Sequence, residues 1–237
     1  MHSAPQAFRT AASALANDIR ADIITGHLPP GARLRIKDLC ERYGSGAIPL
    51  REALSRLATS GFVVAEDQRG FRVADVSAAE LIDITETRIH VECEALRRAI
   101  AQGGLDWEER LAGAHYRLGR IAMRPQEGPG LNLEWEQAHS AFHSALISGS
   151  GSNSLIAIAE LLRDQTARYR HLSVSRTSGA GPDRERDVAR EHRELLEATL
   201  ARDTVRATEL LAEHLRRTTE LVLAHTPQMS AFIEQEA

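Results

Sequence analysis

Strand-like patterning is confined to one short stretch of this chain, and this limits the fold more than any other feature. Residues 62–65 (FVVA) form an apolar run, residues 66–70 (EDQRG) form a polar turn, and residues 71–73 (FRV) alternate as a strand does. After Val76 the apolar residues recur at the spacing typical of amphipathic helices. The sequence therefore predicts a mainly α protein with a single two-stranded hairpin.

Three helices are expected before this hairpin. Apolar residues at helical spacing, with glycine or proline at the ends, place them at residues 8–24, at residues 36–43 and from Pro49 to Leu57. A glycine-containing turn joins the second helix to the third, which is typical of a helix-turn-helix. With the hairpin as a wing, residues 1–76 are predicted to form a winged helix-turn-helix.

The rest of the chain, residues 77–237, is predicted to form an all-α six-helix bundle that follows the first domain without a long linker. Glycine- and proline-containing breaks separate its helices. We expect them at residues 78–102, 106–124, 131–148, 152–172, 183–201 and 204–225.

Composition narrows the class further. With 237 residues and 43% hydrophobic content, the chain can bury a core in each of two domains. No apolar run approaches the roughly 18 residues of a membrane span, and the N-terminus lacks a signal-peptide pattern, so we expect a cytoplasmic protein without membrane contact. Residues 1–75 carry a net charge of +2 and the remainder −6. Cys40 and Cys93 have no metal or redox spacing, and we expect both to be reduced.

Basic residues in the first domain are candidates for DNA contact. The second helix of a helix-turn-helix enters the major groove, so Arg51 and Arg56 are expected to contact phosphates and base edges. Lys37 on the preceding helix, and Arg69 with Gly70 at the wing, are expected to reach the flanking backbone or the minor groove. The alternative is that these are ordinary solvated charges.

A longer string favours the DNA-binding interpretation. Residues 49–57 (PLREALSRL), preceded by LPPGARL and followed by GFV and GFRV, resemble the winged helix of the GntR family. The resemblance implies a bacterial repressor that responds to a ligand and binds a pseudo-palindromic operator as a homodimer. The family's usual Ser-Arg-Thr turn is replaced here by Gly46, Ala47 and Ile48, so a base-reading arginine is missing at Ala47. Lys37 stands where many members have arginine.

Four of the ten histidines form a pattern that suggests a metal site. His139 and His143 are four residues apart and therefore project from one face of a helix. His192 and His214 lie on the last two expected helices. Imidazole suits zinc, nickel, copper or iron. The alternative is that these residues are surface or satisfied core histidines.

The same histidines resemble the metal-binding motif of the FCD domain, the C-terminal ligand-binding domain of the FadR subgroup. Phe142-His143, His192 and His214 match that motif, whereas His139 occupies its acidic first position. All-nitrogen coordination favours zinc, or else nickel, over manganese, and should attract an anionic effector. The strings EWEQAHSAFH and ARYR are similar to those of glutarate-responsive repressors, which implies a dicarboxylate or a related organic acid.

Two further residues are expected to bind the effector. Arg88 corresponds to an arginine that FCD proteins place on their first bundle helix, where it could clamp a carboxylate. An intrahelical pair with Glu92 is the alternative. Tyr169 is a candidate hydrogen-bond donor.

Two other functions remain open on sequence alone. A histidine-bound metal could activate water in a hydrolase-like enzyme, but no acidic residue has the spacing of a general base, and we expect no enzyme activity. Alternatively, the metal could serve only to brace the bundle.

Overall fold

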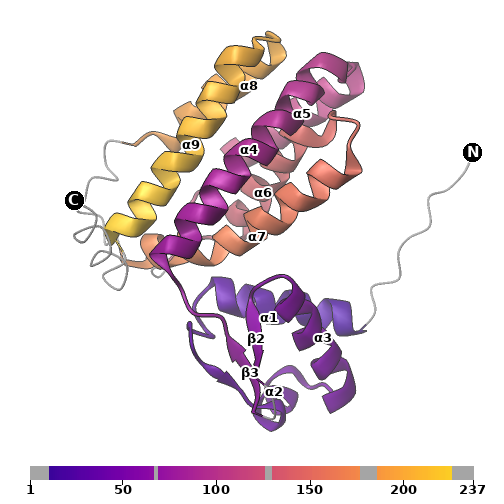
Figure 1. Ribbon diagram of the computed structural model, residues 1–237, viewed down its shortest axis with the longest axis vertical. Helices are drawn as coiled ribbons and strands as arrows, with labels where there is room; N and C mark the ends of the chain where they lie inside the picture. The colour runs from indigo at the N-terminus through magenta and orange to yellow at the C-terminus, as the bar shows by residue number, and fades with distance from the viewer. Residues whose placement is uncertain (1–10, 67–68, 126–129, 177–185, 226–237) are drawn as a thin grey trace, which may run out of the picture. The chain divides into compact units, whose positions relative to one another are not determined.

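The chain divides into two compact units, Met1–Asp75 and Val76–Ala237. The computed structural model describes residues 11–66, 69–125, 130–176 and 186–225 (Figure 1). These residues are mainly helical, as the sequence predicts. No helix among them has an apolar stretch long enough to span a bilayer.

The first unit is a three-helix domain with a small sheet. Its helices are α1 (Ala11–Ile24), α2 (Ile36–Tyr43) and α3 (Ala47–Thr59). Ile19 of α1, Leu50 and Leu54 of α3, and Phe62 are fully buried and form its core. Helix α2 ends at Gly44, whose φ of 60° lies in the left-handed region that favours glycine. That residue makes the tight turn into α3.

The sheet confirms the predicted wing and adds a strand. Strands β2 (Val63–Glu66) and β3 (Gly70–Val73) pair antiparallel, as expected for the hairpin. A further strand, β1 (Arg33–Leu34), pairs antiparallel with the other edge of β3, so the order is β1-β3-β2. Strand β1 escaped prediction because two residues are too few to show alternation.

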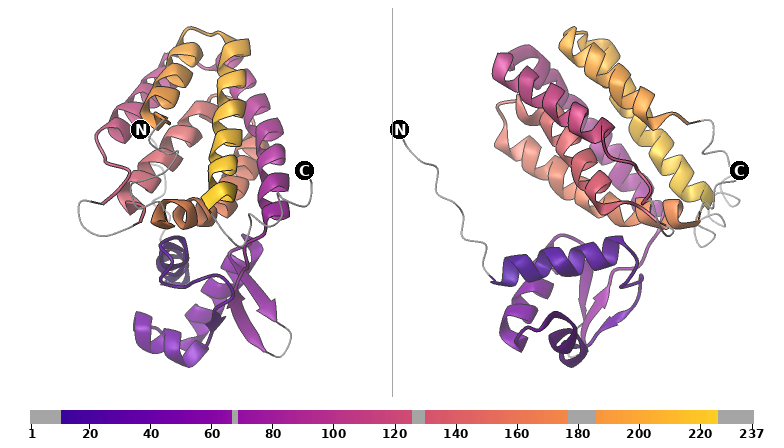
Figure 2. Two further views of the ribbon diagram at one scale, coloured as in Figure 1. Left: turned by 90° about the vertical axis from the view of Figure 1, so that its left-hand side faces the viewer. Right: turned by 180° about the vertical axis from the view of Figure 1, so that it is seen from behind.

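The second unit is a helical bundle around α4 (Figures 1 and 2). Helix α4 packs against α6, α7 and α9, while α5 packs against α6 and α8. All of these helices contribute to one buried core that includes Leu96, Trp107, Phe142, Leu195 and Leu211. The helices are α4 (Ala78–Gln102), α5 (Leu105–Gly119), α6 (Leu133–Ser148), α7 (Asn153–Arg176), α8 (Val188–Leu200) and α9 (Thr204–His225).

The two largest differences between predicted and observed helix ends have local reasons, and helix α7 also extends to Arg176, beyond the predicted residue 172. Helix α5 ends at Gly119 rather than near residue 124, because the following segment bonds to Asn132 through the carbonyls of Ala122 and Met123. Helix α8 begins at Val188 rather than near residue 183, because the Asp187 side chain caps it. The predicted break at residues 178–182 lies outside the described residues, as does most of the break at residues 125–130.

Candidate functional site

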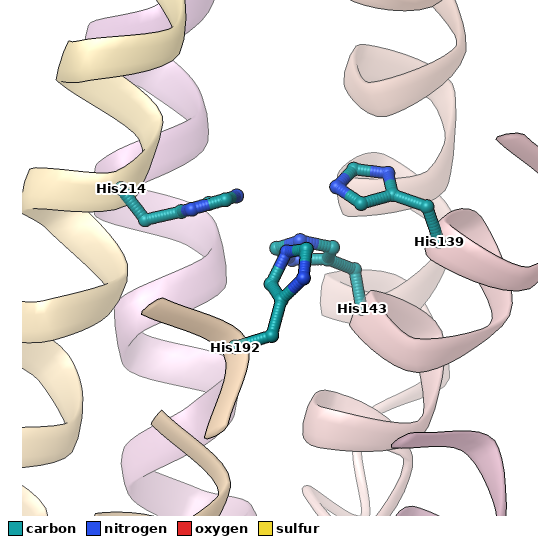
Figure 3. Close-up of side chains that lie close together, drawn as sticks. All are labelled: His139, His143, His192 and His214. Carbon is teal, nitrogen blue, oxygen red and sulfur yellow. The ribbon is translucent and has the colours of Figure 1, made fainter. Parts of the chain in front are cut away.

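The bundle brings the four predicted histidines together. His139 and His143 lie one turn apart on α6, His192 comes from α8, and His214 comes from α9. Their side chains point toward one another (Figure 3). Each offers one ring nitrogen to a group of atoms that all lie within 4.8 Å of one another. Helices α6, α8 and α9 thus converge on one point.

The hydrogen bonding of these rings fits a metal ion. All four side chains are buried, and His143 is 0% exposed. The Nδ1 of His139, both ring nitrogens of His143 and the Nε2 of His192 have no hydrogen-bond partner among the described residues. A buried polar atom without a partner costs free energy, so such atoms are rare unless something else satisfies them. A cation bound between the rings would do so.

Burial also selects the protonation state that a metal needs. Desolvation lowers the pKa of all four histidines, and that of His192 falls to about 2. The positive charge of Arg170 lowers the pKa of His139 further. The rings are therefore neutral near pH 7, and neutral imidazole is the form that donates a lone pair to a metal.

The carboxylate of Glu191 orients the ring of His214. The Nδ1 of His214 lies 2.7 Å from a carboxylate oxygen of Glu191, and the Arg186 guanidinium donates two hydrogen bonds, of 2.8 and 2.7 Å, to the same carboxylate. Although burial opposes it, hydrogen bonding to Arg186 and His214 holds the pKa of Glu191 well below its usual range. Glu191 was not predicted, since it lies 23 residues from His214.

A cavity of about 170 Å³ opens beside the histidines. His139 and His214 form one part of its wall, and three arginines, Arg124, Arg170 and Arg186, form another. The remaining lining is mostly apolar and comprises Met123, Leu131, Trp135, Val188, Thr218 and Leu221. Basic groups near a neutral, metal-binding cluster favour an anionic ligand with an apolar body.

Neither predicted effector-binding residue lines this cavity. Arg88 is buried and forms the intrahelical pair with Glu92 that the sequence offered as the alternative to effector binding. Its Nε lies 2.8 Å from a carboxylate oxygen of Glu92, and its Nη1 lies 2.9 Å from the Thr166 hydroxyl. The hydroxyl of Tyr169 contacts Glu80, Arg168 and the backbone N–H of Ser77.

The arginines that do line the cavity were not predicted. Arg170 belongs to the ARYR string, but spacing could not show which of its arginines faces the site. In the structure its Nε donates a 3.2 Å hydrogen bond to the buried Glu136. Arg124 and Arg186 lie at helix connections, where periodicity gives no signal.

The first unit presents all of its predicted DNA-contacting residues to solvent. Lys37, Arg51 and Arg69 are exposed, as is Gly70, whose φ of 93° favours glycine at the wing turn. Arg56 is exposed but engaged, because its guanidinium donates hydrogen bonds to Glu52 (2.6 Å) and to Ser13 of α1 (2.9 Å). It therefore ties α3 to α1.

A winged helix-turn-helix followed by a helical domain with a cavity beside a histidine cluster defines a class: the DNA-binding regulators with a separate ligand-binding domain. Comparison with known families agrees. Residues 11–73 match the family described as "Bacterial regulatory proteins, gntR family", and residues 83–217 match the FCD domain. The chain belongs to the GntR family, and its C-terminal domain is an FCD domain.

Relatives place it among transcription regulators. The transcriptional repressor GlaR of Escherichia coli is 39% identical over 197 residues, which cover 83% of this chain and 89% of GlaR. The regulator BphR of Paraburkholderia xenovorans is also 39% identical, covering 86% of this chain and 82% of BphR. The solved structure of E. coli McbR/YncC shares the fold, with a TM-score of 0.73 at 24% identity, covering 90% of this chain and 97% of that one.

These comparisons identify the chain as a DNA-binding transcriptional regulator. The family and the relatives that it matches in sequence are described as transcription regulators, so the hydrolase-like alternative finds no support.

Proposed function

We propose that this protein is a homodimeric transcriptional repressor that carries a divalent metal on His139, His143, His192 and His214, and whose operator binding responds to a small organic acid in the adjacent cavity. The observation that carries the proposal is the convergence of four buried imidazoles, several with unsatisfied nitrogens. The similarity to the repressor GlaR favours repression over activation.

Zinc suits the four-nitrogen ligand set best, since it commonly takes tetrahedral nitrogen ligands; nickel is the next choice. The bound metal would supply positive charge that attracts a carboxylate. Glu191 would keep the Nε2 of His214 turned toward the metal by accepting a hydrogen bond at Nδ1. Arg170 and Arg186 would hold the acid, and the apolar wall around Trp135 would exclude water from its carbon chain.

The cavity suggests a ligand of few carbons. Its volume of about 170 Å³ is below the roughly 300–1,000 Å³ typical of sites for drug-sized ligands. Basic residues at more than one point of the wall favour an acid with two carboxylates, such as glutarate. Arg88 would then support the site from outside its wall, because the Thr166 hydroxyl accepts hydrogen bonds from both Arg88 and Arg170.

The metal is tested by elemental analysis of protein purified without added metal. We expect close to one equivalent of zinc or nickel per chain, and little in a His143→Ala variant. His90→Ala is the matched control, because His90 is an exposed histidine on α4. Equal metal in wild type and His143→Ala would contradict the site.

The effector is tested by electrophoretic mobility shift on the promoter of the protein's own gene. Linear dicarboxylates of three to six carbons are added in turn, with matched monocarboxylates as controls. We expect one dicarboxylate to weaken the shifted band. If no fragment shifts at moderate salt, the repressor proposal fails; if none of the acids alters the shift, the effector proposal fails.

A purely structural metal is the second candidate, because four protein ligands can complete a closed tetrahedral shell. Thermal unfolding separates the two. A structural metal raises the midpoint with no further rise when acids are added, whereas a sensor gains stability as RT ln(1 + [L]/Kd) with its own ligand.

A further inference from the structure

Helix α3 begins with an unusual surface residue. Ile48, its second residue, is 83% exposed, more than any other large apolar side chain that the structure describes. The residues before it, Gly46 and Ala47, are small and also exposed, so nothing near it in the chain covers its side chain. A large aliphatic group in water loses the free energy that burial would provide, so its position calls for a partner.

The position of Ile48 on the helix identifies the face it occupies. The opposite face of α3 carries Leu50, Ala53, Leu54 and Leu57, and these residues are buried in the core of the first unit. Ile48 shares the exposed face with Arg51 and Ser55, which follow at three and seven residues. This is the face that a recognition helix turns into the major groove, where its N-terminal residues reach the base edges.

The chemistry of that groove offers one apolar group. The 5-methyl of thymine is the only hydrocarbon among the base edges, and aliphatic side chains contact it there. Neither Ala47 nor Ile48 has a side-chain hydrogen-bond donor or acceptor, so the first turn of α3 cannot distinguish bases by side-chain hydrogen bonds. Arg51, which shares this exposed face of α3, is basic and makes the surroundings suitable for DNA and unfavourable for an apolar protein partner.

We propose that Ile48 is a specificity-determining residue that selects thymine in each operator half-site through contact with its 5-methyl group. The inference rests on the DNA-binding function and not on the metal or the effector. It implies an operator in which the position facing the start of α3 is a T·A pair.

Uracil tests this contact directly, because it differs from thymine only by lacking the methyl group. Duplexes that bind the full-length protein are first selected from a randomised pool, and each thymine of the selected site is then replaced singly by uracil. Affinities are measured by fluorescence anisotropy at one fixed salt concentration. At one thymine in each half-site we expect the wild-type Kd to rise about fourfold, the effect of one lost methyl contact.

Variants assign the effect to the side chain. Ile48→Ala should bind the thymine duplex about as weakly as the wild type binds the uracil duplex, and it should be insensitive to the replacement. Ile48→Val keeps most of the apolar surface and should keep most of the sensitivity. Ile158→Ala, at a 45% exposed isoleucine on α7, is the matched control and should retain the full wild-type response.

Each of the following results would overturn the proposal. If no uracil replacement changes the wild-type Kd, thymine methyl groups are not read. If Ile48→Ala stays sensitive to the same replacement, another residue reads the methyl group. A change of oligomeric mass in Ile48→Ala together with an unchanged uracil scan would show that Ile48 contacts protein instead, and would likewise reject the proposal.

Discussion

At the scale of single residues, the histidine cluster is defined by what burial does to an imidazole. Four rings lie close together in the bundle core, and desolvation keeps them uncharged. The same desolvation that destabilises the protonated form prepares the site for a cation that accepts lone pairs. The cluster is therefore suited to a metal and poorly suited to a proton.

The first prediction concerns the pH dependence of the metal-free protein. An ordinary histidine is protonated below about pH 6.5, but the buried ones have lowered pKa values. Below pH 6.5 the unfolded chain therefore binds more protons than the folded protein, and the free energy of unfolding falls as the pH decreases. We expect a loss of roughly 1 kcal/mol per buried histidine between pH 6.5 and 5.5.

This dependence is measured by urea unfolding of chelator-treated protein at several pH values. The free energy of unfolding of His192→Asn should change less with pH than that of the wild type. His90→Ala should show the same pH dependence as the wild type. A free energy of unfolding that stays constant from pH 7.5 to 5.5 would show that the histidines are not buried as described.

The second prediction concerns the carboxylate behind His214. Glu191→Gln keeps the size of the side chain but removes the charge that orients the ring and faces Arg186. Loss of such an outer partner typically lowers metal affinity by about 10- to 100-fold. Competition with a chromogenic chelator measures this, and Glu213→Gln, on the exposed face of α9, should leave the affinity unchanged.

At the scale of elements, the connection between α4 and α5 requires a residue without a side chain. Gly103 ends α4, and a Cβ added there would lie 2.2 Å from Cε3 of Trp107 and 2.6 Å from the carbonyl oxygen of Ala99. Trp107 is itself buried and donates a 2.8 Å hydrogen bond to the carbonyl of Ala145 on α6. The absence of a side chain at Gly103 therefore lets the tryptophan join α5 to α6.

The third prediction is that Gly103→Ala destabilises the protein by about 1–3 kcal/mol, the usual cost of overpacking a core. Gly113→Ala is the control, and this substitution is expected to stabilise the protein. Gly113 lies within α5 with open space around it, so alanine should add about 0.5–1 kcal/mol through helix propensity. Both are measured by denaturant unfolding, and equal effects of the two changes would contradict the packing at Trp107.

At the scale of the whole molecule, charge is divided between the two units. Residues 1–75 carry a net charge of +2, and the remaining residues carry −6. Attraction to DNA phosphates must therefore come from the first unit. The second unit is negative overall, but three of its arginines, Arg124, Arg170 and Arg186, line the cavity.

The fourth prediction follows from this division. Lys37→Ala should weaken binding to all DNA sequences alike and reduce the slope of log Kd against log salt by about 1, because one phosphate contact is lost. Arg206→Ala, at an exposed arginine of α9, should leave the slope unchanged. Anisotropy titrations between low and moderate salt give both slopes, and equal slopes for the wild type and Lys37→Ala would remove Lys37 from the DNA-contacting set.

The sequence by itself determined the winged helix, the helical character of the rest and the four histidines, because periodicity, glycine breaks and the spacing of His139 and His143 are local properties. Only the tertiary structure decided which charges face the cavity. Arg88 and Arg170 are equally basic in the sequence, but packing of α4 against α7 buries the first against Glu92 and Thr166 and leaves the second in the wall. Glu191 meets His214 only because α8 packs on α9. Contacts between distant segments depend on helix packing, which no local pattern encodes.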